Sequence, residues 1–212
     1  MHLIIQGSDV ATTDLKQLAK LAGADGIEQI SPDVFRLVNA SPAAGIAELC
    51  AQARLDHALV PADRRLADIR LLVMDMDSTL ITIETIDELA DMIGLKPEVA
   101  TITAQAMRGE IEYDESLRRR LALLKGENES ALTRVYDERL KLSPGAERLL
   151  AQAKNHGIKT LLVSGGFTYV TDRLKTRLGL DFTYSNTLEI KDGRLTGEIV
   201  GRTVNAEAKR DE

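Results

Sequence analysis

Short apolar runs alternate along the chain with segments in which apolar residues recur at helical spacing, and this alternation predicts an α/β protein. In the N-terminal part the predicted order is strand, helix, strand, strand, helix, strand. The strands are expected at residues 3–6, 27–30, 34–38 and 58–60, and the helices over 14–22 and from Pro42 to Ala53. This order is typical of a ferredoxin-like α+β unit.

A second pattern begins with the apolar run at residues 69–74, which leads directly into Asp75 and Asp77. The run is too short for a helix, so it predicts a buried strand that delivers two carboxylates at its carboxyl end. The rest of this core is expected as a helix from Pro144 to His156, a strand at 159–163, a helix over 168–178, a strand at 181–185 and a type I′ hairpin at Asp192-Gly193. Together these elements predict a doubly wound parallel sheet, a Rossmann-like core.

Several helical patterns separate the first two core strands. They are expected from Thr85 to Ile93, from Pro97 to Gly109, from Tyr113 to Lys125 and from Glu129 to Leu140. Thr85 and Glu88 have the spacing of a capping box at the start of the first helix. Consecutive helices at this point predict a cap over the carboxyl edge of the sheet. The predicted domains are an α+β domain at 1–64, a core at 65–81 and 143–212, and a helical cap at 82–142.

Composition narrows the classes of function. The chain has 212 residues and a formal net charge of -6, which argues against nonspecific binding to nucleic acid. No apolar run approaches the roughly 20 residues that a membrane-spanning helix needs. Cys50 is the only cysteine, so no internal disulfide can form, and this favours a cytoplasmic protein.

Asp75 and Asp77 are the first candidates for chemistry. An Asp-x-Asp pair is a weak signal alone, because aspartates at a strand end also cap turns. Ligands of open α/β sheets, however, bind outside the carboxyl ends of the strands. There one carboxylate can attack phosphorus while the other serves as general acid and base. Two neighbouring anions favour a cation, and Mg²⁺ suits carboxylate oxygens beside a phosphate.

Ser164, Gly165 and Gly166 follow the second predicted core strand. They form either a tight turn that requires glycine or a phosphate nest, in which a hydroxyl and backbone N–H groups bind an anion. We favour the nest, because two neighbouring strands then end in complementary chemistry.

Helix geometry singles out Arg120 from the basic run 118–120. At about 100° per residue, Arg118 and Arg119 point away from the apolar stripe of their helix, whereas Arg120 lies on it. An inward cation needs an anionic partner, either a substrate carboxylate or an internal acid, unless the side chain reaches water past the leucines. The pattern alone gives Glu84 and Lys209 no role beyond that of solvated charges.

Several motifs occur in order between residues 69 and 212: Asp75-Met76-Asp77-Ser78-Thr79, Ile83 to Ala90, Ala106-Met107-Arg108-Gly109, Ser116 to Arg120, Val163 to Phe167, and Lys191 to Gly197. In this order and spacing they resemble the haloacid dehalogenase superfamily, and within it the phosphoserine phosphatases. The N-terminal part resembles, more weakly, an extra domain that some bacterial members carry.

The resemblance implies a role for each matching residue. Asp75 would form an aspartyl-phosphate, and Asp77 would protonate the leaving serine oxygen and then activate water. Mg²⁺ would be bound by the Asp75 carboxylate and the Asp77 backbone carbonyl. Ser164 and Gly165 would hold the phosphate, and Lys209 would neutralise it.

The resemblance also implies that Glu84 and Arg120 bind the ammonium and the carboxylate of the substrate, O-phosphoserine. A bidentate arginine suits a carboxylate, so the inward-facing Arg120 gains a partner.

The family pattern continues past the lysine to a Gly-Asp-Gly-x-x-Asn-Asp segment, whose aspartates complete the metal site. This chain ends at Glu212, three residues after Lys209. We therefore expect a C-terminally truncated form that binds Mg²⁺ weakly and is nearly inactive. With three predicted parallel strands, it should also leave a sheet edge and apolar faces uncovered, which favours self-association into a homo-oligomer.

Three functions follow from these observations. The first is Mg²⁺-dependent hydrolysis of O-phosphoserine to serine and phosphate, the last step of serine biosynthesis. The second is a related phosphatase or phosphotransferase that acts on another small phosphomonoester. The third is a non-catalytic protein that binds an amino acid through residues 1–60.

Overall fold

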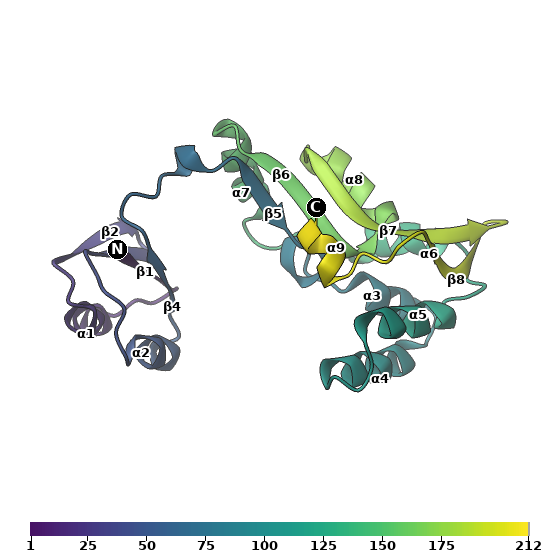
Figure 1. Cartoon of the computed structure of the whole chain (residues 1–212), viewed down its shortest axis with the longest axis horizontal. Helices are drawn as coiled ribbons and strands as arrows, with labels where there is room; N and C mark the ends of the chain where they lie inside the picture. Colours follow the sequence, from purple (N-terminus) through teal and green to yellow (C-terminus); the bar gives the residue numbers. More distant parts are fainter. Residues whose placement is uncertain (212) are drawn as a thin grey trace. The chain divides into compact units, whose positions relative to one another are not determined.

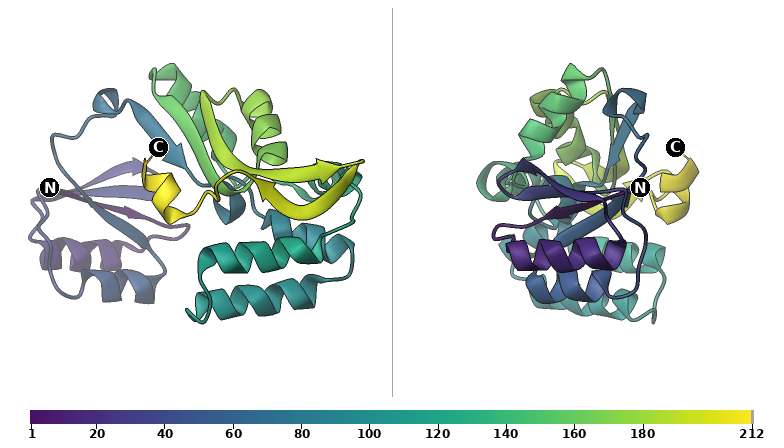
Figure 2. Two further views of the ribbon diagram at one scale, coloured as in Figure 1. Left: turned by 45° about the vertical axis from the view of Figure 1, so that its right-hand side comes forward. Right: turned by 90° about the vertical axis from the view of Figure 1, so that its left-hand side faces the viewer.

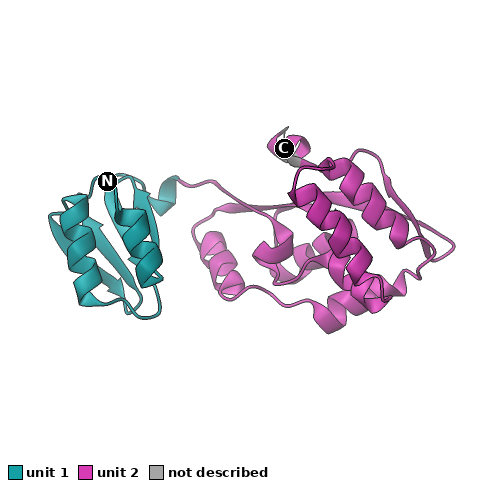
Figure 3. Ribbon diagram, turned by 90° about the horizontal axis from the view of Figure 1, so that it is seen from below, with its two compact units in different colours: residues 1–68 teal, residues 69–212 magenta. Residues whose placement is uncertain are grey.

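A computed structural model describes residues 1–211, with the side chains of residues 206, 209 and 211 left out. The chain divides into two compact units, residues 1–68 and 69–212, which are coloured separately in Figure 3. None of the helices described is both long enough and apolar enough to cross a membrane.

The first unit has the predicted α+β order. Its elements are β1 (His2–Gln6), α1 (Thr12–Ala22), β2 (Gly26–Ser31), β3 (Val34–Val38), α2 (Ile46–Ala53) and β4 (Asp56–Val60), followed by the turn η1 (Leu66–Asp68). The strands form an antiparallel sheet in the order β2-β3-β1-β4. Leu3 and Ile5 on β1 pack in one core with Leu18 on α1 and Cys50 on α2. Both helices therefore cover the same face, which confirms the ferredoxin-like prediction.

Two proline-based helix starts were wrong. Helix α2 begins at Ile46, not at Pro42, and α7 (Ala146–Asn155) begins at Ala146, not at Pro144. In each case a glycine with a left-handed backbone stands directly before the helix: φ is 90° at Gly45 and 85° at Gly145. A right-handed helix cannot pass through that conformation, so it begins one residue later.

The second unit is built on a four-stranded sheet in the order β5-β6-β7-β8, seen in Figure 1. The strands are β5 (Leu71–Met74), β6 (Lys159–Phe167), β7 (Phe182–Lys191) and β8 (Arg194–Val200). The first three are parallel, as predicted, and β8 runs antiparallel to β7. Helix α7 leads into β6, and α8 (Thr168–Leu178) connects β6 to β7.

Helices α7 and α8 pack on one face of this sheet. Leu150 on α7 and Leu174 on α8 share a buried cluster with Met74 and Leu162 from the strands. The alternate side chains of β5 lie on the other face, where Leu71 is 45% and Val73 55% exposed. The prediction of a buried first strand was therefore wrong for half of its side chains, whereas the expected uncovered apolar face is confirmed.

The predicted strand at 181–185 and the first arm of the hairpin are one strand. Strand β7 runs without interruption from Phe182 to Lys191 and pairs with β6 in its first half and with β8 in its second. The predicted type I′ turn is confirmed, because Asp192 and Gly193 both have positive φ, 52° and 71°.

Helices inserted between β5 and α7 form the rest of the unit. They are α3 (Thr85–Met92), α4 (Lys96–Met107), α5 (Tyr113–Leu123), α6 (Ser130–Arg134) and the wide helical turn η3 (Val135–Arg139). We call them the inserted helices. Helices α4 and α5 lie side by side, and α5 also packs on β8 (Figure 2). Leu117 and Leu121 of α5 share a core with Phe167 of β6 and Leu195 of β8.

The inserted helices are attached to the sheet at both ends. The segment that leads from the sheet into the inserted helices pairs with the segment that leads back: the Thr82 N–H donates to the Lys141 carbonyl at 2.9 Å. Beyond α5, the Gly126 N–H donates to Leu195 O at 2.8 Å, and the Leu195 N–H donates to Glu127 O at 2.9 Å. The hairpin β7–β8 is thus joined to the end of α5 by backbone hydrogen bonds.

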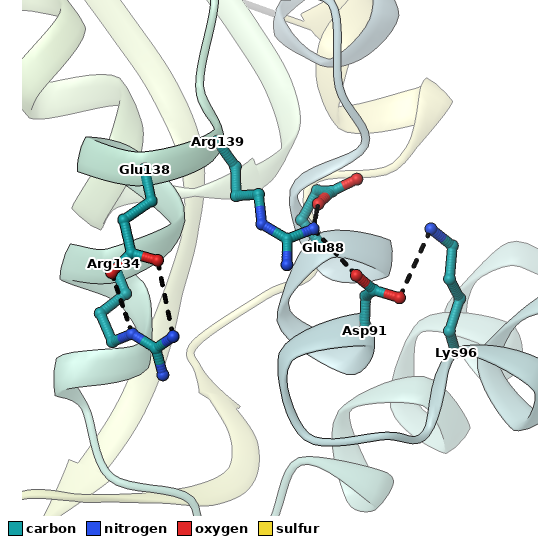
Figure 4. A network of polar contacts seen from close by, with 6 residues as sticks. All are labelled: Glu88, Asp91, Lys96, Arg134, Glu138 and Arg139. Carbon is teal, nitrogen blue, oxygen red and sulfur yellow. Dashed lines mark hydrogen bonds and ion pairs between the residues drawn. The ribbon is translucent and has the colours of Figure 1, made fainter.

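An ion-pair network connects the first and last of the inserted helices (Figure 4). Arg139 at the end of η3 donates from Nη1 to Glu88 at 2.7 Å and to Asp91 at 2.8 Å, both on α3. The pairing with Arg139 lowers the pKa of the Asp91 carboxyl, and Lys96 lies 3.8 Å from the same carboxylate. The network holds the start and the end of the insertion together.

Gly197 offers a test of the contact between β8 and α5. It has φ of 84°, and a Cβ there would lie 3.2 Å from the Leu121 carbonyl oxygen and 3.3 Å from Ala122 Cα. Gly201 has almost the same φ, 83°, with nothing within 4 Å. Both Gly→Ala changes should lower the free energy of unfolding by about 1 kcal/mol through backbone strain. Gly197→Ala should cost roughly 1–3 kcal/mol more through overpacking, as measured by urea unfolding. Equal losses would contradict close packing of α5 on β8.

Candidate active site

Asp75 and Asp77 lie at the carboxyl end of β5: Asp75 directly precedes the turn η2 (Met76–Leu80), and Asp77 lies within it. Asp75 follows the last strand residue, and its Oδ1 accepts a hydrogen bond from the Met76 N–H at 2.8 Å. Ser78 has a left-handed backbone with φ of 52°, and this reverses the chain toward the inserted helices. The sheet edge and the turn together place the two carboxylates at one site.

Asp77 is held by the first residue of α3. Its Oδ1 accepts one hydrogen bond from the Thr85 N–H at 3.0 Å and another from Thr85 Oγ1 at 2.6 Å. Burial raises the pKa of Asp77 to about 6, and the negative charges of Glu84 and Asp75 add to the rise, while the Thr85 bonds oppose it. The pKa of this carboxyl therefore lies well above that of an ordinary aspartate.

The capping-box prediction for Thr85 was wrong. Glu84 is the N-cap residue of α3, and no side-chain capping bond is present. Thr85 is 1% exposed, and its hydroxyl bonds to Asp77. A residue type that usually caps helices is used here to orient a carboxylate, which local sequence cannot reveal.

Ser164, Gly165 and Gly166 form a bulge in β6. The pairing of β6 with β7 skips from Val163 to Phe167, so these three residues stand opposite a single residue of β7. The Gly166 N–H donates to Ser164 Oγ at 2.8 Å, which leaves the hydroxyl proton available to a ligand. A Cβ on Gly166 would lie 2.8 Å from Asp77 Oδ2, so glycine is needed for the bulge to approach the acid.

Glu84 and Arg120 reach the site from the inserted helices. Ser78 Oγ donates to Glu84 Oε1 at 2.5 Å, which holds the carboxylate next to the turn η2. Arg120 is half-buried on α5, and its Nε donates to the Ser116 carbonyl at 3.3 Å. The neighbouring Arg118 and Arg119 are exposed and pair with Glu115, which confirms the predicted orientation of the basic run.

These residues line one cavity of about 370 Å³. Six of the seven residues predicted from sequence are in its wall: Asp75, Asp77, Glu84, Arg120, Ser164 and Gly165. Lys209 belongs to α9 (Ala206–Asp211), and its side chain lies outside what the structure describes.

The cavity wall contains further residues that sequence reasoning did not identify, among them Tyr113, Val204 and Asn205. The Tyr113 hydroxyl occupies the space in which a Cβ on Gly165 would stand. Burial raises the pKa of Tyr113, so the phenol stays protonated. Its position at the start of an amphipathic helix gave no signal, because the contact depends on how α5 meets the bulge.

The acidic residues suit a small divalent cation only in part. Asp75 and Asp77 offer hard oxygen donors, and Mg²⁺ usually takes one or two carboxylates together with substrate phosphate oxygens and water. Among the side chains that the structure describes, no group of three or more His, Cys, Asp or Glu residues is arranged to hold a metal. The donors therefore fit Mg²⁺ that is bound together with a phosphorylated ligand.

Comparison with known proteins decides the family. A model of haloacid dehalogenase-like hydrolases matches residues 72–212. The chain belongs to the haloacid dehalogenase-like hydrolase family. A second model, of a domain of unknown function, matches residues 3–46. Among the curated members, a phosphoserine phosphatase of Polaromonas sp. is 54% identical over 153 residues, and one of Haemophilus influenzae is 37% identical over 210 residues.

Solved structures of this hydrolase family share the fold. A family hydrolase from Salmonella enterica serovar Typhi matches 99% of the chain with a TM-score of 0.85 at 30% identity, and the chain covers 75% of it. A probable phosphoserine phosphatase from Vibrio cholerae matches 99% of the chain with a TM-score of 0.79 at 34% identity, and the chain covers 66% of it. The chain spans 65% of the Polaromonas relative's length and 67% of the Haemophilus relative's.

The hydrogen bonds of Thr85 predict how the pKa of Asp77 responds to mutation. In metal-free protein, Thr85→Val removes the hydroxyl that stabilises the ionised carboxylate, so the pKa should rise above about 6. A hydrogen bond to a charged group is worth roughly 1.5–3 kcal/mol, which corresponds to a rise of about one to two units. Carbon-13 NMR titration of the Asp77 carboxyl measures it.

Two variants serve as controls. Thr85→Ser keeps the hydroxyl and should keep the pKa. Thr82→Val removes a hydroxyl that faces the Lys141 carbonyl instead, so it should leave Asp77 unchanged. A pKa that stays the same or falls in Thr85→Val would contradict the role given to Thr85.

Proposed function

We propose that this protein is a Mg²⁺-dependent phosphatase that hydrolyses O-phosphoserine to serine and phosphate, the last step of serine biosynthesis. The observation that carries the proposal is the distribution of charge in the cavity. Asp75, Asp77 and the bulge at Ser164 lie on the sheet edge, whereas Glu84 and Arg120 come from the inserted segment. The residues on the sheet edge suit a phosphoryl group, and the two charged residues of the inserted segment suit the ammonium and carboxylate of an amino acid.

Asp75 is the proposed nucleophile. Its carboxylate attacks the phosphorus of the substrate, the bond to the serine oxygen breaks, and an aspartyl-phosphate forms on Asp75. Ser164 Oγ–H and the backbone of the bulge donate to the phosphoryl oxygens. Lys209 is the proposed additional cation at this phosphate.

Asp77 is the proposed general acid and base. In the first step its proton passes to the leaving serine oxygen. In the second step the carboxylate takes a proton from the water that attacks the aspartyl-phosphate, and phosphate is released. Both roles need a pKa closer to neutral pH than that of an ordinary aspartate, and the rise to about 6 that burial produces supports them.

Recognition of serine is assigned to the opposite wall. The Arg120 Nε donates a hydrogen bond to the Ser116 carbonyl, which holds the guanidinium in place. Its two terminal nitrogens can then donate to a substrate carboxylate. Glu84, held by Ser78, is suited to the substrate ammonium. The pair is complementary to the two charges of a free amino acid.

Mg²⁺ would be held by the Asp75 carboxylate and the Asp77 backbone carbonyl. When bound, it neutralises the negative charge shared by the carboxylates and the phosphoryl group.

The proposal extends to the predicted domains. We assign the chemistry to the core at 65–81 and 143–212, and the selection of the substrate to the cap at 82–142. The α+β domain at 1–64 has no assigned chemistry. A single, buried, free cysteine, Cys50, supports a cytoplasmic location.

Arg120 provides the test of substrate choice. Arg120→Ala should raise KM for phosphoserine about 100-fold, because a charged hydrogen-bonded contact is worth up to about 3 kcal/mol. The KM for phosphoethanolamine, which has the ammonium and phosphate but no carboxylate, should change little. Steady-state release of phosphate measures both.

Arg119→Ala is the matched control, because Arg119 is adjacent, exposed and paired with Glu115. It should leave both KM values unchanged. An equal effect of Arg120→Ala on the two substrates would reject the proposed carboxylate contact. If the wild-type protein hydrolyses another small phosphomonoester better than phosphoserine, that compound class would replace phosphoserine as the proposed substrate.

A further inference from the structure

A buried asparagine connects the bulge of β6 to the segment that leads into α9. Asn186 is 2% exposed and lies on β7 opposite Phe167, where the pairing of β6 and β7 resumes. Its Nδ2 donates to the Gly165 carbonyl at 2.7 Å, and its Oδ1 accepts from the Val204 N–H at 2.8 Å. One side-chain amide is thus shared by two segments that are far apart in the sequence.

The first bond sets the shape of the bulge. The Gly165 carbonyl belongs to the peptide group that also contains the Gly166 N–H, and a peptide group is planar. Holding the carbonyl therefore orients the N–H that donates to Ser164 Oγ. Through this peptide group, Asn186 influences where the Ser164 hydroxyl points.

The second bond, from the Val204 N–H to Asn186 Oδ1, positions the part of the cavity wall formed by Val204 and Asn205. Val204 lines the cavity, and Oδ1 of the next residue, Asn205, accepts from the Ala208 N–H at 3.0 Å, a bond that caps the start of α9. Asn205 Nδ2 also lies 3.3 Å and 3.4 Å from the two carboxylate oxygens of Asp114 on α5. The segment held by Asn186 therefore connects α9 to the inserted helices.

We propose that Asn186 is a positioning residue for the phosphate site, which keeps the Ser164–Gly166 bulge and the Val204–Asn205 segment at a fixed separation around the phosphoryl group. The inference rests on the proposed function. Asn186 does not line the cavity, so it acts through its two partners. Without the amide, the Gly165 carbonyl and the Val204 N–H each lose a hydrogen bond. Because it is costly to leave buried polar groups unpaired, both segments should move until these groups find new hydrogen-bond partners.

The experiment compares Asn186→Leu, which keeps the size but loses both bonds, with the smaller Asn186→Ser and the wild type. Asn155→Leu, at an exposed asparagine at the end of α7, is the control. Calorimetry with Mg²⁺ gives the Kd of inorganic phosphate, and turnover gives KM and kcat for phosphoserine. Both Asn186 variants should raise Kd and KM about 10- to 100-fold, as loss of supporting contacts around a site does. Asn155→Leu should change neither.

A double variant separates positioning from a general structural role. In the Lys209→Ala background, the effect of Asn186→Leu on the Kd of phosphate should shrink, because the cation proposed for the phosphate is carried by α9, which follows the segment held by Asn186, and this cation is already gone. Effects that simply multiply would overturn this part of the inference.

A folded Asn186→Leu protein whose Kd for phosphate stays within about twofold of the wild type would overturn the proposal. If that variant does not fold, Asn186→Ser decides by the same criterion. A wild type that binds phosphate without hydrolysing phosphoserine would contradict the proposed function alone, and the ratio of Kd values would still decide on Asn186. A wild type that binds no phosphate would overturn both.

Discussion

The pair of hydrogen bonds from Thr85 to the Asp77 carboxylate joins the two parts of the site. Asp77 stands at the end of a core strand, and Thr85 is the first residue of the first inserted helix. The same contact orients the carboxylate, limits the rise of its pKa and fixes where α3 begins. Glu84 directly precedes Thr85, so the residue proposed to bind the ammonium is positioned by the contact that positions the acid.

Charge in the cavity follows from this arrangement. Among the described side chains, three carboxylates, those of Asp75, Asp77 and Glu84, lie in its wall with one guanidinium, that of Arg120. Such a wall repels a phosphate unless cations and N–H donors offset the charge, and partial burial makes the repulsion stronger. In the proposed function, Mg²⁺, Lys209 and the N–H groups of the β6 bulge would supply that compensation. Burial is the main cause of the raised pKa of Asp77, and the neighbouring charges of Glu84 and Asp75 add to the rise.

The sequence was informative where periodicity and turn chemistry act locally. It predicted the three parallel strands, the ferredoxin-like unit, the type I′ turn at Asp192 and the orientation of Arg120. It failed where tertiary contacts override local preference: the Thr85 hydroxyl bonds to Asp77, and a left-handed Gly45 delays the helix expected at Pro42. Tyr113 and Asn186 carried no local signal, because their contacts join segments distant in sequence. The resemblance to a family, not the pattern, suggested roles for Glu84 and Lys209.

The central claim is that Asp75 becomes phosphorylated during turnover. The most direct measurement is rapid quenching of the protein with isotopically labelled phosphoserine and Mg²⁺, followed by mass spectrometry of its peptides. The account predicts one labelled phosphoryl group on Asp75, formed and lost at rates no slower than turnover, and absent in Asp75→Asn. Turnover without any phosphorylated residue, or with the label on a residue other than Asp75, would contradict the account.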